Sequence, residues 1–159
     1  MTTERDALCA FLDKQRAALT GRLDGLTDAQ AGSTPTASSL SLLGLLKHAG
    51  IWERRWFQVA VEGTVFPGEW PDTAKSDSND EDFVLDASDT VERWRTYHAA
   101  QVAQSRRIAT TRSLDAPCAW PPAEDRTLRW VLLHMIEETA RHAGHADIIR
   151  ETLDGTRGV

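Results

Sequence analysis

Apolar side chains recur every three to four residues in four stretches of the chain, which is the spacing of an amphipathic helix. The pattern predicts helices at about residues 4–26, 40–61, 88–110 and 127–153. The apolar stripe that we expect the first helix to turn toward the core consists of Leu8, Phe11, Leu12, Leu19 and Leu23. No convincing set of strands competes with this pattern. The sequence therefore predicts an all-α fold, a four-helix bundle.

The ends of the predicted helices carry capping signals. Thr2 or Thr3 can cap the first helix, and Ser39 or Ser41 the second, because a hydroxyl oxygen accepts hydrogen bonds from the free N–H groups of a first turn. The fourth helix is expected to stop near Gly155, since glycine readily adopts the conformation that ends a helix.

Three connections join the helices. Residues 27–38 contain Gly, Pro, Ser and Thr and are predicted to form a connection. Longer loops are expected at 62–86 and 112–126, and two adjacent prolines in the second loop are taken to exclude a helix there. The acidic run at 76–82 is interpreted as solvated surface, because it lacks the glycine and closing glutamate of a calcium-binding loop. Both long loops can form a lid or a pocket wall.

Length and composition indicate one globular domain spanning residues 1–159, with 41% hydrophobic and 26% charged side chains. No apolar run reaches the ~18 residues of a membrane span, and charges occupy the N-terminus where a secretory signal has its apolar stretch. We therefore expect a cytoplasmic protein in which Cys9 and Cys118 stay reduced. The formal charge of −6 argues against nucleic acid and anionic membranes as partners.

Five ionisable side chains share one face of the predicted fourth helix. With His134 at 0° and about 100° per residue, Glu138 falls at about 40°, His142 at about 80°, His145 at about 20° and Arg141 at about −20°. Apolar helix-packing residues fall in the same arc. A face of this composition is costly to bury unless its polar groups are paired or bind something.

Part of this face has the spacing of a metal site. Glu138 and His142 are four residues apart, so their tips can converge on one ion. Imidazole and carboxylate ligands suit Zn²⁺, our first choice, and also Ni²⁺, Fe²⁺ or Mn²⁺. A third ligand must come from another helix, and His48, at the edge of the second helix's apolar stripe, is the candidate. The alternative is a buried hydrogen-bonded network, in which Glu138 pairs with Arg141 or a histidine and nothing binds.

Other residues are candidates for roles around such an ion. His134 and His145 are interpreted either as partners that orient a ligand through hydrogen bonds or as ordinary polar packing. Six tryptophans are many for a chain of this length. Trp52, Trp56 and Trp130 are therefore candidates to line a pocket, with core and surface packing as the alternative.

Two segments, LLKHAGIWERRWF and EETARHAGHADIIRE, resemble the DinB/YfiT-like superfamily, and the similarity covers essentially the whole chain. The chain looks most similar to actinobacterial members and to the metal-binding domain of mycothiol-dependent maleylpyruvate isomerase. The resemblance implies a mononuclear metal held by His48, Glu138 and His142, with Glu138 standing where many members have His. It also implies a low-molecular-weight thiol as cosubstrate and is compatible with a homodimer.

The resemblance leads to a hypothesis of a thiol S-transferase. A metal-activated thiolate would attack a small electrophilic molecule, while His145, Arg141 or His134 relays a proton or holds an anionic group. Metal-dependent hydrolysis of a small molecule needs the same ligands and is the second hypothesis. The third is a non-catalytic stress protein that binds a metal or another ligand.

Overall fold

The computed structural model describes residues 2–67 and 79–158. Each of its four long helices begins at a hydroxyl side chain that accepts a hydrogen bond from an N–H of the first turn. These helices and their caps are α1, Glu4–Gly21 (Thr3), α3, Leu42–Glu53 (Ser41), α4, Val91–Thr111 (Thr90), and α5, Leu128–Asp154 (Thr127). Helix α5 ends at Gly155, whose φ of 78° is in the left-handed region that favours glycine.

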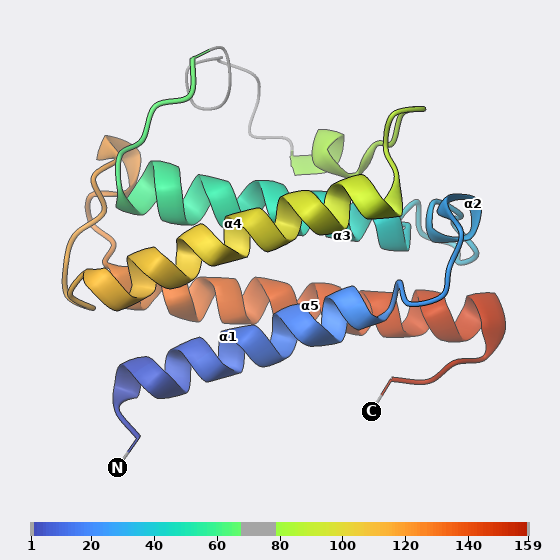
Figure 1. The fold of residues 1–159 in the computed structure, drawn as a ribbon, viewed down its shortest axis with the longest axis horizontal. Coiled ribbons are helices and arrows are strands. Elements are labelled where there is room, and N and C mark those ends of the chain that lie inside the picture. The colour runs from blue at the N-terminus through green and yellow to red at the C-terminus, as the bar shows by residue number, and fades with distance from the viewer. Residues whose placement is uncertain (1, 68–78, 159) are drawn as a thin grey trace.

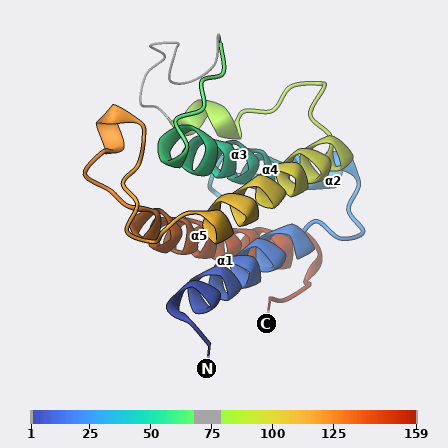
Figure 2. The ribbon, with the colours of Figure 1, turned by 60° about the vertical axis from the view of Figure 1, so that its left-hand side comes forward.

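The four long helices lie in two layers (Figure 1). Helices α3 and α4 pack together in one layer and α1 and α5 in the other, and a view turned by 60° shows the same pairing (Figure 2). Two clusters of buried apolar side chains form the core, one around Phe57 and Val131 and one around Leu45 and Ala146. The prediction of an all-α fold is confirmed, because the part of the chain that the structure describes contains helices and no strand.

Shorter helical segments add detail that the sequence pattern did not predict. A one-turn helix, α2 (Asp28–Ala31), lies within the expected connection. Helix α3 continues directly into a π-helix, η1 (Arg54–Val61), so the second predicted helix changes its hydrogen-bond pattern partway. Two 3₁₀ turns, η2 (Asn79–Phe83) and η3 (Pro121–Ala123), lie in the two long loops. Excluding helix from the second loop was therefore wrong, since prolines are tolerated in a first turn, where the N–H needs no partner.

One residue of the stripe predicted for the first helix faces outward. Phe11 is 58% exposed, whereas Leu12 and Leu19 are fully buried. At about 100° per residue, Phe11 lies about 60° to one side of Leu8, and the other leucines lie to the opposite side. The prediction was wrong for Phe11, and the helix also ends earlier than predicted, at Gly21.

Part of the acidic run that was assigned to solvent is covered by protein. Residues 76–78 of that run lie outside the described residues. The Oδ2 atom of Asp82 accepts hydrogen bonds from Trp52 Nε1 at 3.1 Å and from Arg55 Nη1 at 2.7 Å. Desolvation raises the pKa of Asp82 above its usual range. The surface assignment is therefore wrong for Asp82, which attaches η2 to α3.

Two expectations from composition can be compared with the fold. Cys9 and Cys118 are both free thiols, as predicted. Among the described residues, none of the helices combines the length and the apolar character that crossing a membrane requires.

Candidate metal centre

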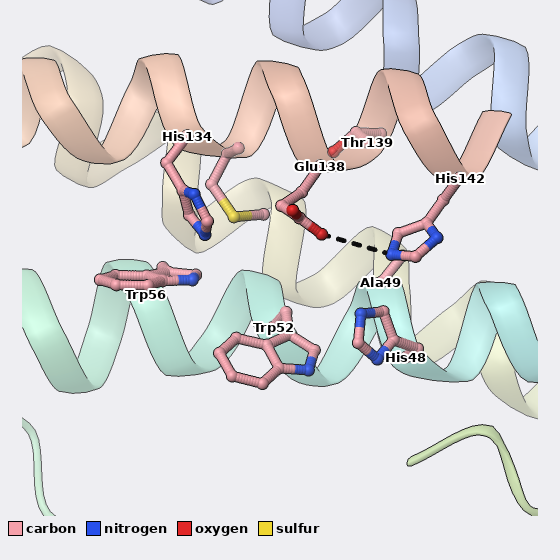
Figure 3. Close-up of a pocket in the computed structure, with 9 residues that line it drawn as sticks. His48, Ala49, Trp52, Trp56, His134, Glu138, Thr139 and His142 are labelled. Atoms are coloured by element: carbon pink, nitrogen blue, oxygen red, sulfur yellow. Dashed lines mark ion pairs between the residues drawn. The ribbon is translucent and has the colours of Figure 1, made fainter. Parts of the chain in front are cut away.

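His48, Glu138 and His142 meet between facing surfaces of α3 and α5 (Figure 3). Each of them offers one ligand atom, and these three atoms lie within 4.8 Å of one another. Glu138 and His142 leave the same face of α5 because they are one turn apart. His48 comes from α3, and its ring centroid lies 4.8 Å from that of His142. The structure thus brings together the three ligands that the sequence suggested.

Burial keeps the two histidines of this cluster in their neutral form. His48 is 6% exposed and His142 is 9% exposed. Burial, together with the electrostatic influence of His142 and Arg55, lowers the pKa of His48 to about 3. Burial also lowers the pKa of His142, although the Glu138 carboxylate acts in the opposite direction. Neutral imidazole is the form that coordinates a metal, so neither histidine must first lose a proton at neutral pH.

Ring nitrogens of both histidines are left without hydrogen bonds to any described residue. They are Nδ1 of His48 and both nitrogens of His142, and all three are buried. A buried polar atom without a partner costs about 1–3 kcal/mol. Coordination to a cation would satisfy such nitrogens, and a set of two imidazoles and one carboxylate suits Zn²⁺ and its first-row neighbours. The residues present therefore fit a divalent metal ion.

The two oxygens of Glu138 have different surroundings. Oε1 accepts a hydrogen bond from Arg141, whereas Oε2 lies 3.5 Å from Nε2 of His142. The Arg141 pair is what the hydrogen-bonded-network alternative expects. However, the Arg141 side chain is 51% exposed and also binds Glu137, so this pair is screened by solvent and contributes little stability. Oε2 remains beside the histidines as an oxygen that can accept a cation.

A cavity of about 230 Å³ opens beside this cluster. Its walls consist of the three cluster residues and of Ala49, Trp52, Trp56, His134, Met135 and Thr139. Figure 3 shows Trp52 of α3 and Trp56 of η1 at increasing distance from the cluster, with His134 of α5 facing Trp56. The cavity therefore has its candidate ligands at one end and aromatic walls along its length.

His134 lies between two tryptophans at the far end of the cavity. Its ring stacks on Trp130, with centroids 4.9 Å apart and planes 16° apart. Its edge meets Trp56 at 4.8 Å. Burial lowers the pKa of His134, so its ring is neutral near pH 7. Of the three tryptophans suggested for a pocket, Trp52 and Trp56 line the cavity, and Trp130 supports His134 instead.

His145 and Arg141 do not line the cavity. The His145 ring lies 5.8 Å from the His142 ring, and its buried Nδ1 has no hydrogen bond to the described residues. Arg141 faces solvent and is engaged with Glu137 and Glu138. Among the three residues suggested for proton relay or anion binding, His134 is the one that reaches the cavity wall.

Phe83 of η2 is a neighbour of the cluster that sequence reasoning missed. Its ring stacks on His48, with centroids 4.2 Å and planes 13° apart. The backbone of η2 can come this close because α3 has Gly44, where a Cβ would lie 2.8 Å from the Phe83 carbonyl oxygen. The one indication that the sequence offered for Phe83 was the expectation that its loop forms a lid or a pocket wall. Three further wall residues were missed although each follows a candidate site residue in sequence: Ala49, Met135 and Thr139.

A helical bundle that gathers two histidines and a glutamate between its second and fourth long helices has the features of the DinB/YfiT-like class. The family model described as mycothiol-S-transferase matches residues 7–155, and the chain belongs to this family. A solved structure of a conserved protein from Enterococcus faecalis is similar in fold, with a TM-score of 0.67 and 18% identity. That similarity covers 98% of this chain and 100% of the other. A comparison with curated proteins gave no significant match.

Proposed function

We propose that this protein is a metal-dependent thiol S-transferase whose divalent ion is held by His48, Glu138 and His142. The observation that carries the proposal is the convergence of three ligand atoms within 4.8 Å at one end of an aromatic cavity. Three protein ligands leave coordination positions open, which is the arrangement of catalytic rather than structural metal sites. Membership of the mycothiol-S-transferase family supports a thiol as the second substrate.

The chemistry divides between the metal and the side chains of the cavity. When bound at this cluster, a divalent cation supplies the positive charge that keeps a thiol deprotonated near neutral pH. His134 is neutral and lies on the wall at the far end of the cavity, so the proton that the thiol loses can reach it through water in the cavity but not directly. Trp52 and Trp56 keep water from the electrophile. The thiolate sulfur then bonds to the electrophilic carbon, and the leaving group departs with its electron pair.

The finer parts of this proposal rest on chemistry and on the family. Zn²⁺ is the ion that we propose first, because it accepts imidazole and carboxylate ligands together and has no redox chemistry of its own. Mycothiol is the proposed thiol, which the family description supports. The relation to the metal-binding domain of maleylpyruvate isomerase and the homodimer remain predictions from the sequence.

Conjugation of mycothiol to 1-chloro-2,4-dinitrobenzene, with the products identified by mass spectrometry, tests the proposed function. We expect the metal-loaded protein to form the thioether and release chloride. His142→Ala removes a ligand and should lower the rate by about 100-fold or more. Mutating even a hydrogen-bond partner of a metal ligand typically lowers metal affinity or activity by about 10–100-fold. Without thiol, the electrophile should stay intact.

Glu137→Ala is the matched control for this assay and for any variant of the neighbouring ligand candidate Glu138. The two glutamates are adjacent in sequence, but the Glu137 side chain is 63% exposed and does not line the cavity. This variant should keep the wild-type rate. Formation of dinitrophenol without thiol would support the hydrolase alternative, and metal binding without turnover of any thiol acceptor would support a binding protein. Either result would contradict the proposed transferase.

A further inference from the structure

Arg126, the second residue before α5, is held in a fixed position near the far end of the cavity. Its backbone N–H donates to the Ala123 carbonyl at 3.0 Å, and its carbonyl accepts from the Cys118 N–H at 2.9 Å. The guanidinium lies over the Trp130 ring at 4.3 Å from the centroid and over the Trp56 ring at 5.4 Å. Stacking on indole faces orients the flat guanidinium without using its N–H groups.

The polar edge of this guanidinium has little to bind within the described part of the chain. Its one ion pair there is with Asp125, at the long distance of 4.0 Å, and it makes no side-chain hydrogen bond. The other guanidiniums near the cavity are engaged, since Arg55 binds Asp82 and Arg141 binds two glutamates. The Arg126 side chain is 35% exposed, which leaves its donors accessible to a ligand.

The cavity extends from the candidate metal ligands toward this arginine, which contacts one of its wall residues. Trp56 lines the cavity and also contacts Arg126, so one indole separates the guanidinium from the cavity interior. His134 and His142 mark the two ends, and their separation of eight positions corresponds to roughly 12 Å along a helix. A molecule that reaches from the metal ligands toward Arg126 must lie along the indoles of Trp52 and Trp56.

We propose that Arg126 binds an anionic group of the electrophilic substrate, and that this substrate is a flat apolar molecule carrying a carboxylate. The inference rests on the proposed function, because it places an anionic group of that substrate just beyond the far end of the same cavity. A guanidinium with a fixed plane offers two parallel N–H donors to a carboxylate, which is the geometry of a strong bidentate pair. The chain carries a formal charge of −6, so an anionic substrate needs such a local cation to bind.

Calorimetric titration of the metal-loaded protein with 2-naphthoate and with uncharged 2-naphthamide tests this assignment without requiring turnover. We expect wild type to bind the carboxylate at least about tenfold more tightly than the amide, because the carboxylate can form a charge-assisted hydrogen-bonded pair that the amide cannot form. Arg126→Ala should abolish the preference. Arg126→Lys should keep only part of it, because lysine retains the charge but not the planar pair of donors. Thermal unfolding of each variant confirms that it is folded.

Arg93→Ala is the matched control, because Arg93 also lies over a tryptophan ring, that of Trp94, at 5.3 Å. Trp94, unlike Trp56, does not line the cavity, and this variant loses the same charge, so it should keep the full preference. The assignment is overturned if wild type binds both naphthalenes equally or binds neither. It is also overturned if the preference persists in Arg126→Ala, which would place the anion on the metal, or if Arg93→Ala loses it. Thiol transfer that survives such a result would leave the proposed function standing.

Discussion

Glu53 and Glu138 are carboxylates on neighbouring helices with opposite surroundings. Glu53 is 1% exposed, and its two oxygens accept hydrogen bonds from Arg16 at 2.7 Å each, with a third from Ser105 at 2.6 Å. Its acceptor sites are thus used within the fold. Glu138 is partly exposed, and one of its oxygens lies beside His142. We therefore assign a structural role to Glu53, whereas the surroundings of Glu138 are compatible with its proposed role as a metal ligand.

Removing the carboxylate of Glu53 should strongly destabilise the bundle. In Glu53→Ala, the guanidinium of Arg16, which is 6% exposed, keeps Asp13 as its one ion-pair partner among the described residues. A buried charge that loses its partner typically costs about 3–5 kcal/mol, and urea unfolding measures the loss. The control is Glu151→Ala, which breaks an exposed pair with Arg157 and should cost less than about 1 kcal/mol. Equal losses in both variants would refute this role of Glu53.

His98 should make the stability of the metal-free protein depend on pH. His98 is 4% exposed, and burial is the main cause that lowers its pKa. The charge of Arg16 also lowers this pKa, whereas the charge of Glu53 acts in the opposite direction. Below about pH 6.5 the unfolded chain therefore binds a proton that the folded chain excludes, and stability falls as the pH falls.

Comparing wild type with His98→Phe isolates this contribution from those of the other histidines. Urea unfolding at pH 7.5 and pH 5.5 should show a smaller loss of stability in the variant than in wild type. The difference cannot exceed about 1.4 kcal/mol per pH unit for one group. A pH dependence that is identical in the two proteins would show that His98 titrates normally in the fold.

The residues that the sequence identified are those whose partners follow from helical spacing. Glu138 and His142 are one turn apart, so their shared face can be calculated from a period of 3.6 residues. Phe83 and Arg126 contact wall residues of the cavity from loops that have no periodicity to read. Phe11 fits the helical spacing but lies at the edge of the arc that its neighbours cover.

At the scale of elements, α3 depends on small residues where η2 approaches it. Gly44 lies against the Phe83 backbone, so Gly44→Ala would push η2 away from α3 and disturb the ring that stacks on His48. We expect this change to cost about 1–3 kcal/mol, as overpacking does, and to weaken the binding of Co²⁺ measured by its absorption spectrum.

Gly144→Ala is the matched control within α5. A Cβ at Gly144 meets nothing within 4 Å, and alanine is favoured over glycine inside a helix by up to about 1 kcal/mol. This variant should therefore be more stable than wild type and should bind Co²⁺ equally well. The packing account fails if Gly44→Ala is also stabilising, or if it leaves Co²⁺ affinity unchanged.

The existence of the four long helices followed from the sequence, but their local irregularities did not. Thr3, Ser41 and Gly155 mark helix ends through side-chain and backbone chemistry that a sequence displays directly. The change from α3 to the π-helix η1 leaves the order of apolar residues helical, so periodicity alone does not reveal it. Because Trp56 lies in η1, the direction of its indole depends on this change.

At the scale of the whole molecule, the site lies between the two helical layers. Helix α3 supplies His48 and Trp52 and its continuation η1 supplies Trp56 from one layer, while α5 supplies Glu138 and His142 from the other. A metal at this position would link the two layers. It would stabilise the fold more strongly the more tightly it binds to the folded protein. The metal is therefore the claim on which the proposed transferase and the role of Arg126 both depend.

Metal content, measured by elemental analysis of protein purified without a histidine tag and dialysed after addition of Zn²⁺, tests this claim most directly. We predict about one divalent ion per chain in wild type and in Glu137→Ala, as a mononuclear site requires. Glu138→Ala and His142→Ala should retain almost none while keeping their helical circular dichroism. No bound metal in wild type after Zn²⁺, Ni²⁺ or Mn²⁺, or full retention in both ligand variants, would contradict the account and leave a hydrogen-bonded network in its place.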